Sequence, residues 1–362
     1  MEAVIKQLFP IVVLFGAATV AFGVVMMVVA YTVLAERKVL GWIQGRIGPN
    51  RVGPWGMMQP FADLLKFIFK EDIVPDKSTK FVYFLAPIVA VTCALMPMVV
   101  YPFGPAITNI DLSFLPYNLG DGIKSIPLTV AQIDVGVLFV LGITSVGIYG
   151  IALAGWSSNS KYALMGGLRA SAQLISYELA MGASVIGVVM LAGTLDLNGI
   201  IFAQISSPFR WFIIPQFIGF LVFLIAAFAE TNRVPFDLPE AETELVAGFH
   251  TEYSALKFAL FFMGEYVNMF TVSVMCATLF LGGWYVPGLS HIVAVGSIPY
   301  ALLSVLGLLV KISAFLFLYI WIRGTLPRFR FDQLMNFGWK FLLPVALANV
   351  IFTIVLVYFL NR

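Results

Sequence analysis

The sequence predicts an all-α integral membrane protein: a bundle of about eight transmembrane helices, with one further amphipathic helix lying in the membrane interface. Sixty per cent of its residues are hydrophobic and only 11% are charged, whereas about a quarter of a soluble domain is charged. With a mean hydropathy of +0.96, the chain has too little polar surface to face water, so lipid must surround most of it. We expect a single polytopic membrane domain over residues 1–362.

Eight stretches are long and apolar enough to cross a bilayer, which takes about 20 residues of helix. They lie at about residues 11–35, 81–101, 134–155, 163–192, 211–229, 256–282, 301–322 and 341–360. The second and third are the least regular, because prolines and glycines interrupt them. The first stretch is too long for the core of a signal peptide and has no small-residue cleavage site, so we expect it to be retained.

The charged loops orient the bundle. Sixteen of the 21 Lys and Arg residues lie in or beside the loops that follow the first, third, fifth and seventh spans. These loops occupy residues 36–80, 156–162, 230–255 and 323–340. Since positively charged loops stay on the cytoplasmic side, these four are predicted to be cytoplasmic and both termini periplasmic, or on the equivalent side of an organellar membrane.

Residues 55–70 form a helix of a different kind. Its polar side chains recur at spacings of four, three and four: Gln59, Asp63, Lys66 and Lys70. This spacing places one polar stripe on an otherwise apolar helix that is too short to span, the pattern of a helix lying in the interface with its aromatic side toward lipid. The segment could be a simple spacer. The alternative is the rim of a gate for a molecule that enters from the bilayer.

Three ionisable residues fall inside predicted spans: Glu178, Glu265 and Lys311. A lone charge near the middle of the bilayer costs at least about 3 kcal/mol, so these side chains should face the bundle interior and pair with one another. A structural Glu–Lys pair is one interpretation. The other is a proton relay, since burial favours the neutral forms of both groups, and the neighbouring Tyr177 and Tyr266 would extend it.

The cytoplasmic loops carry a second set of charges. Glu36 and Arg37 stand where the first span ends, before a glycine-rich loop. The loop after the fifth span holds six acidic residues against Arg233: Glu230, Asp237, Glu240, Glu242, Glu244 and Glu252. The loop after the seventh span holds three arginines: Arg323, Arg328 and Arg330. These loops could be solvated surface, or they could collect protons and dock a partner subunit.

The residue patterns that hold resident cofactors are missing. Cys93 and Cys276 lie singly in apolar stretches, which predicts buried small side chains. His250 and His291 have no partner at ligand spacing, and the sequence has no Cys-x-x-Cys, GxGxxG or P-loop. We therefore expect no metal, haem, flavin or iron–sulfur cluster in this chain, no catalytic redox residue, and no nucleic-acid partner.

Long motifs in and near the loops make the sequence recognisable. They are ERKVLGWIQGRIGPNRVG, QPFADLLKFIFKED, SNSKYALMGGLRASAQLISYE, AETNRVPFDLPEAETELVAGFHTEY, FALFFMGEY and WIRGTLPRFRFDQLM. Essentially from end to end, the chain resembles the quinone-site membrane subunit of proton-pumping NADH:quinone oxidoreductase (respiratory complex I). That subunit is numbered 1 in mitochondria and is designated H in bacteria.

The resemblance implies a non-redox subunit of a respiratory-chain translocase, in the bacterial inner membrane or the mitochondrial inner membrane. In such enzymes a soluble arm oxidises NADH and passes electrons along flavin and iron–sulfur centres held by partner subunits. The subunit that this chain resembles forms the tunnel by which an isoprenoid quinone, such as ubiquinone, reaches the terminal cluster in a neighbour. It also starts a buried acidic path toward small membrane subunits and antiporter-like pumps.

Matched motif by motif, the resemblance implies three groups of residues. The tunnel and its entrance would use Glu36, Arg37, Arg46, Asp63 and Arg233. The proton path would use Glu178, Glu230, Glu240, Glu242 and Glu265, together with Tyr177 and with Lys311, for which a structural role is as plausible. The interface with the soluble arm would use Asp237, Arg323, Arg328 and Arg330.

Two other functions stay open. The equivalent subunit of a related complex fed by ferredoxin, reduced deazaflavin or hydrogen fits nearly as well, because the electron donor is chosen by other subunits. A stand-alone ion-coupled transporter or channel fits the buried glutamates and lysine, but not the long, glycine-rich cytoplasmic loops.

Overall fold

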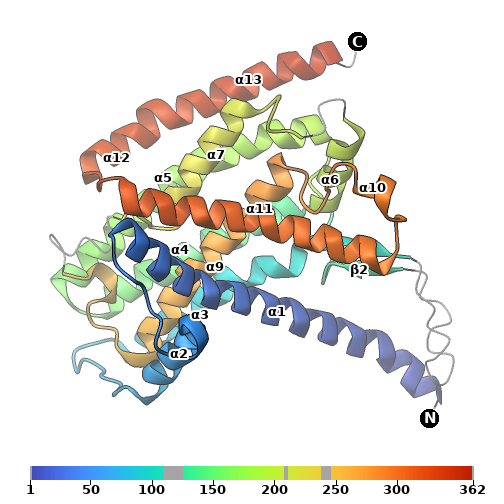
Figure 1. Ribbon diagram of the computed structural model, residues 1–362. Helices are drawn as coiled ribbons and strands as arrows, with labels where there is room; N and C mark the ends of the chain where they lie inside the picture. The colour runs from blue at the N-terminus through green and yellow to red at the C-terminus, as the bar shows by residue number, and fades with distance from the viewer. Residues whose placement is uncertain (1, 109–124, 208–210, 238–245, 361–362) are drawn as a thin grey trace.

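The computed structural model describes residues 2–108, 125–207, 211–237 and 246–360. The long helices form one bundle (Figure 1). In chain order they are α1 (Glu2–Ile43), α3 (Lys80–Leu95), α4 (Gly136–Ser157), α5 (Lys161–Ala192), α9 (Ala255–Phe280), α11 (Ile298–Thr325) and α13 (Leu343–Leu360). Within the described residues, seven helices are long and apolar enough to cross a membrane. The predicted fold class is confirmed.

The fifth expected span is shorter than the sequence predicts. Helix α7 covers Phe217–Glu230, and its 14 residues make a helix about 21 Å long, less than the roughly 30 Å of a bilayer core. The preceding residues, 211–216, form turns. Together with α7 the long helices alternate in direction, so that α1 begins and α13 ends at the same end of the bundle (Figure 1).

The amphipathic segment is a helix, but it begins later than predicted. A short 3-10 turn, η1 (Pro54–Gly56), precedes α2 (Gln59–Phe69), because Trp55 and Gly56 both have positive φ and interrupt the helix. The Phe67 ring of α2 lies 6.2 Å from Phe258 of α9.

Several short elements were not predicted. They are helix α6 (Leu197–Ser206), helix α10 (Leu289–Ile292), helix α12 (Phe331–Phe337), which continues into α13 through a π-helical turn (Gly338–Leu342), and a hairpin of β1 (Gly104–Ile107) with β2 (Ile126–Leu128). Helix α6 is too short to span. It is preceded by Asp196, whose carboxylate accepts hydrogen bonds from the backbone N–H groups of Asn198 and Gly199 and so caps the N-terminus of the helix.

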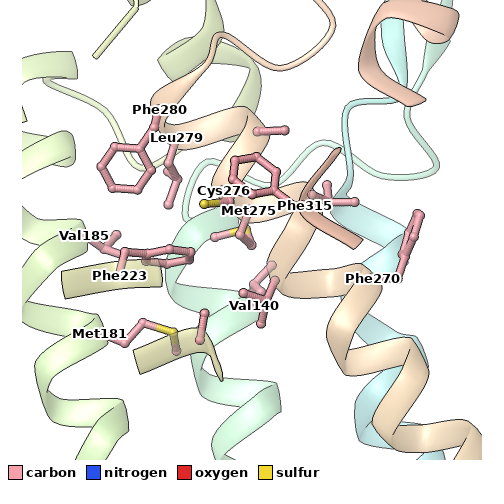
Figure 2. Packing of buried hydrophobic residues seen from close by; sticks show 14 of the residues in the cluster. Val140, Met181, Val185, Phe223, Phe270, Met275, Cys276, Leu279, Phe280 and Phe315 are labelled. Carbon is pink, nitrogen blue, oxygen red and sulfur yellow. The ribbon is translucent and has the colours of Figure 1, made fainter. Parts of the chain in front are cut away.

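The core lies where α5, α7 and α9 meet α4 and α11. Figure 2 shows Phe223 of α7 among side chains of α5 and α9, with its ring centre 5.6 Å from that of Phe280. Cys276 is in the same cluster, and both it and Cys93 are buried, free thiols. The prediction for the two cysteines is confirmed.

Small residues let the helices approach closely. In lipid, helix association depends on close van der Waals packing rather than on hydrophobic burial, which favours glycine and alanine at interfaces. A Cβ atom at Gly150 of α4 would lie 2.8 Å from the backbone nitrogen of Ala90 in α3. Gly142, on the same helix, has nothing within 4 Å of such an atom.

We predict that Gly150→Ala lowers the stability of the bundle and Gly142→Ala does not. The added methyl group at position 150 meets backbone that cannot move aside, and such overpacking costs about 1–3 kcal/mol. At position 142 the substitution gains about 1 kcal/mol of helix propensity. Melting temperatures of the purified complex check this, and equal melting temperatures for the two variants would contradict it.

Candidate functional site

Five side chains from distant parts of the chain meet in one group, which we name the junction cluster: Glu36, Arg233, Glu265, Tyr266 and Arg323. The Arg233 guanidinium places one nitrogen 3.7 Å from a Glu36 oxygen and another 3.8 Å from a Glu265 oxygen. Arg323 pairs with Glu36, and the Tyr266 hydroxyl donates to the same carboxylate at 2.7 Å. The cluster joins α1, α9, α11 and the segment after α7.

The centre of the junction cluster is buried. Glu36, Arg233 and Glu265 are only 4%, 5% and 8% exposed. Arg233 also stacks over the Tyr266 ring at 4.2 Å, a contact that suits a flat, weakly hydrated guanidinium. Breaking a buried ion pair on one side typically costs about 3–5 kcal/mol, because it leaves the other charge without its partner.

The segment after α7 is shaped to bring Arg233 to this place. Gln173 of α5 donates from its amide nitrogen to the backbone carbonyls of Ala229 and Phe236, at 2.8 and 2.7 Å. The chain therefore turns back over α5 after Glu230 and presents Arg233 to α1 and α9.

A cavity beside the junction cluster contains three of the predicted proton-path residues. Glu178 of α5, Glu230 at the end of α7 and Glu265 of α9 all line it, and we name it the carboxylate cavity. About 40 Å³ of it is open to the centre of a water molecule. Since one buried water needs about 10–15 Å³ on this measure, the cavity has room for about three.

The contacts of these carboxylates differ. The Ser145 hydroxyl donates to Glu178. One oxygen of Glu230 is buried and has no hydrogen-bond partner among the described residues. Glu230 also lines a second, smaller cavity together with Thr144 and Thr271, among side chains that are mostly apolar. Glu265 takes part in both the carboxylate cavity and the junction cluster, so it connects the two.

The hydroxyl groups at these cavities were missed from the sequence. Serine and threonine inside apolar helices usually bond the preceding turn of their own helix. Thr144 does this too, since its hydroxyl lies 3.2 Å from the Val140 carbonyl and 3.0 Å from that of Leu141. Nothing in the sequence distinguishes such a residue from one that only packs, so only the three-dimensional position of Thr144, Ser145 and Thr271 reveals them.

Apart from the two residues in the junction cluster, the residues expected at the tunnel entrance are Arg37, Arg46 and Asp63, and they lie at or near the end of α1. Arg37 donates to Asp63 of α2 at 2.7 Å, and Gln59 also donates to Asp63, at 3.0 Å. Half of the polar stripe of α2 therefore turns toward α1 instead of water. Arg46 is exposed and bonds Gln44 at 2.7 Å.

Lys311 is not near the carboxylates. Its ammonium group donates to the backbone carbonyls of Leu281, Gly283 and Tyr285 at 2.8, 2.7 and 2.7 Å. These three bonds use all of its N–H groups and satisfy carbonyls just past the end of α9, as a basic side chain commonly does at a helix C-terminus. The pairing with a glutamate that the sequence suggested is not what the structure contains.

Tyr177 points away from the carboxylate cavity. Its hydroxyl donates to the Leu334 carbonyl of α12 at 2.9 Å. Adjacent residues of a helix project in directions about 100° apart, so the neighbour of Glu178 in sequence does not share its cavity. Tyr266, the neighbour of Glu265, bonds Glu36 in the junction cluster.

The residues expected at the interface with the soluble arm do not all lie in one place. Asp237 and Arg328 pair at 2.8 Å, with the carboxylate buried and the arginine half-buried. Arg330 is exposed and lies 3.4 Å from Asp332. Arg323, by contrast, is committed to Glu36 inside the junction cluster. Glu240 and Glu242 lie outside the described residues.

Comparisons with known proteins show the family of the chain. The chain matches the protein family described as NADH dehydrogenase over residues 16–354. The chain belongs to the NADH dehydrogenase family. In Koribacter versatilis, the NADH-quinone oxidoreductase subunit designated H 2 is 52% identical, with 96% of this chain and 97% of the relative covered. Subunit 8 of the Rhodothermus marinus enzyme is 49% identical, with 93% and 96% covered.

A third relative, the NADH-quinone oxidoreductase subunit designated H 2 in Geobacter sulfurreducens, is 50% identical with 92% of each chain covered. The resemblance stated from the motifs is confirmed. With seven described helices able to span a membrane and bacterial members of the family as close relatives, the chain is a multi-pass integral protein of the bacterial inner membrane.

His250 is part of the packing around the site. It is buried against the rings of Phe249, Phe258 and Phe261. Burial, with a smaller effect of the Arg233 charge, lowers the pKa of His250 from its usual 6.5 to about 3. Among the described residues, no group of three or more His, Cys, Asp or Glu side chains is placed to hold a metal ion.

We predict that the free energy of unfolding of the native chain, relative to that of His250→Leu, decreases as the pH is lowered. Below pH 6.5 the unfolded chain takes up a proton at His250 and the folded chain does not, so at pH 5 about 2 kcal/mol of stability is lost. Melting temperatures between pH 7.5 and pH 5 measure this. His291→Leu, at an exposed position, is the control. A constant difference between native and His250→Leu would contradict the prediction.

Proposed function

We propose that this chain is the membrane subunit of a proton-translocating NADH:quinone oxidoreductase that forms the quinone-access tunnel and starts the acidic path coupling quinone reduction to proton pumping. The observation that carries the proposal is the position of Arg233, 3.7 Å from Glu36 and 3.8 Å from Glu265. This one side chain joins a residue assigned to the tunnel to a residue assigned to the proton path.

The outer surface near the tunnel residues suits an isoprenoid tail. Large apolar side chains are exposed at the end of α1, in the loop after it and on α2: Trp42, Ile47, Trp55, Leu64, Leu65 and Phe69. Exposed apolar patches of this kind mark contacts with lipid or with an apolar ligand. The Arg37–Asp63 pair ties α2 to α1 beside this patch, and Glu36 lies one residue away on the inner side.

The junction cluster supplies a coupling mechanism. Reducing a quinone to a quinol adds two electrons and takes two protons from nearby groups, so in this proposal the charge near Glu36 changes while the reaction proceeds. Unit charges about 4 Å apart interact by about 4 kcal/mol at an effective dielectric constant near 20, which changes a proton-binding equilibrium about a thousandfold. Through Arg233, a change at Glu36 alters the tendency of Glu265 to bind a proton.

The carboxylate cavity is the next step in this mechanism. Glu265 lines it together with Glu178 and Glu230, and a few waters in the cavity would carry a proton among the three. Glu240 and Glu242 would complete the acidic path. The electrons do not pass through this chain, since flavin and iron–sulfur clusters belong to partner subunits of the proposed complex.

Contacts with partners follow from the same arrangement. The Asp237–Arg328 pair lies on the side that the positively charged loops predict to be cytoplasmic, where a surface that docks the soluble arm holding the terminal cluster is expected. The names of the three relatives favour NADH over ferredoxin, reduced deazaflavin or hydrogen as the electron donor. Isolating the intact complex and identifying its electron-donor module tests this choice.

We predict that Glu230→Gln and Glu178→Gln, each made in the assembled complex, lower proton pumping at least about tenfold, because an amide cannot take up and release the proton that the path requires. Pumping and NADH:quinone reductase activity are measured together in proteoliposomes. Glu71→Gln, at an exposed loop position, should change neither. Full pumping in both cavity variants would contradict the proposed path.

A further inference from the structure

A further hollow, lined almost wholly by apolar side chains, lies between α7, α11 and α12. We name it the α7–α11–α12 groove. About 570 Å³ of it is open to the centre of a water molecule, against about 40 Å³ in the carboxylate cavity. Its walls include Ile225, Ile322 and Phe337, and among the described residues that line it only Gln333 is polar. In Figure 1, α11 and α13 diverge from α12 with α7 between them.

Water does not fill such a space well. A site that offers almost no hydrogen-bond partner stays dry or takes an apolar ligand, and its volume is within the range of small-molecule pockets. The groove also reaches the surface, because Leu326 and Phe329 on its rim are each nearly half exposed. In a chain that spans a membrane, the apolar molecule available at such an opening is a lipid.

A cation follows the rim of the groove in the chain. Arg330 follows Phe329 directly, and its backbone N–H donates to the Gln333 side chain at 3.4 Å. Its guanidinium is 77% exposed, and its partner Asp332, at 3.4 Å, is 63% exposed. An ion pair this exposed is weak, so Arg330 can turn to another anion.

An aromatic side chain indicates the level of the groove opening in the membrane. Trp321 is exposed on α11, next to the lining residue Ile322, and exposed tryptophans gather at the level of the lipid headgroups. Arg330 lies between the end of α11 and the start of α12, on the face that the positively charged loops predict to be cytoplasmic. Basic positions between transmembrane helices on that face bind anionic headgroups.

We propose that the α7–α11–α12 groove binds one anionic phospholipid, with an acyl chain between Ile225, Ile322 and Phe337 and the phosphate at Arg330. Charge complementarity decides the headgroup. A guanidinium can pair with the phosphate of any phospholipid, but only an anionic phospholipid lacks a positive group in its headgroup that cancels the phosphate charge and opposes Arg330. An uncharged quinone would use the same apolar walls but leave Arg330 without a role. In this proposal Arg330 binds a lipid phosphate and not the soluble arm. The proposal does not depend on the proton path.

Photo-cross-linking of the intact complex in lipid nanodiscs tests this. The probes are phosphatidylglycerol and phosphatidylcholine, each with a diazirine on one acyl chain. We expect peptides that contain Ile225 and Phe337 to be labelled about fivefold more by the anionic probe, the ratio that one basic residue near the headgroup confers. Phe352, exposed on α13, is the control position and should be labelled equally by both.

Two pairs of variants complete the experiment. Arg330→Gln should reduce anionic labelling in the groove to the level of phosphatidylcholine, while Arg330→Lys should keep the preference. Ile225→Trp, which fills the groove, should abolish groove labelling in a complex that still assembles on a native gel, whereas Ile351→Trp, at an exposed position on α13, should not.

Three results would overturn the proposal. Equal labelling of the groove and of Phe352 by both probes would mean ordinary surface lipid. No groove labelling in the assembled complex would mean that a partner subunit covers it. Loss of the label on addition of excess quinone would mean that a quinone tail is the natural occupant.

Discussion

The arrangement depends on one buried guanidinium shared by two carboxylates. Arg233 is 5% exposed and contacts Glu36 on one side and Glu265 on the other, so neither glutamate can change its charge without changing the environment of the other. Arg323 and Tyr266 hold Glu36 in place, and Gln173 holds the backbone that delivers Arg233. The end of α7 at Glu230 matters as well, because the segment that follows turns back against Gln173 of α5 and delivers Arg233.

The polar groups of the bundle divide into those that connect and those that only stabilise. Glu265 belongs to both the junction cluster and the carboxylate cavity, so its side chain joins the two. Lys311, in contrast, uses its three donors on backbone carbonyls past α9, and His250 stays neutral in an aromatic pocket. Both residues are ionisable, and His250 is buried while Lys311 is half-buried, yet their surroundings suit packing better than proton transfer.

Much of the fold could be predicted, because hydropathy and the cost of charge in lipid act on the sequence directly. Those two effects give the long spans and the inward direction of Glu178 and Glu265. The length of α7 and the partner of Lys311 depend on tertiary contacts that leave no periodic trace. The resemblance assigned Glu36, Arg233, Glu265 and Arg323 to three separate groups, and only coordinates bring them together in one cluster.

Infrared difference spectra of the intact complex, recorded between oxidised and reduced quinone, test the link through Arg233 most directly. A carboxyl band that disappears in Glu265→Gln should change on quinone reduction in the native complex, persist in Arg233→Lys, which keeps a positive charge, and lose its response in Arg233→Met. If no band assigned to Glu265 responds to quinone reduction, or if the response is the same in Arg233→Met, then Arg233 does not couple the quinone site to the acidic path.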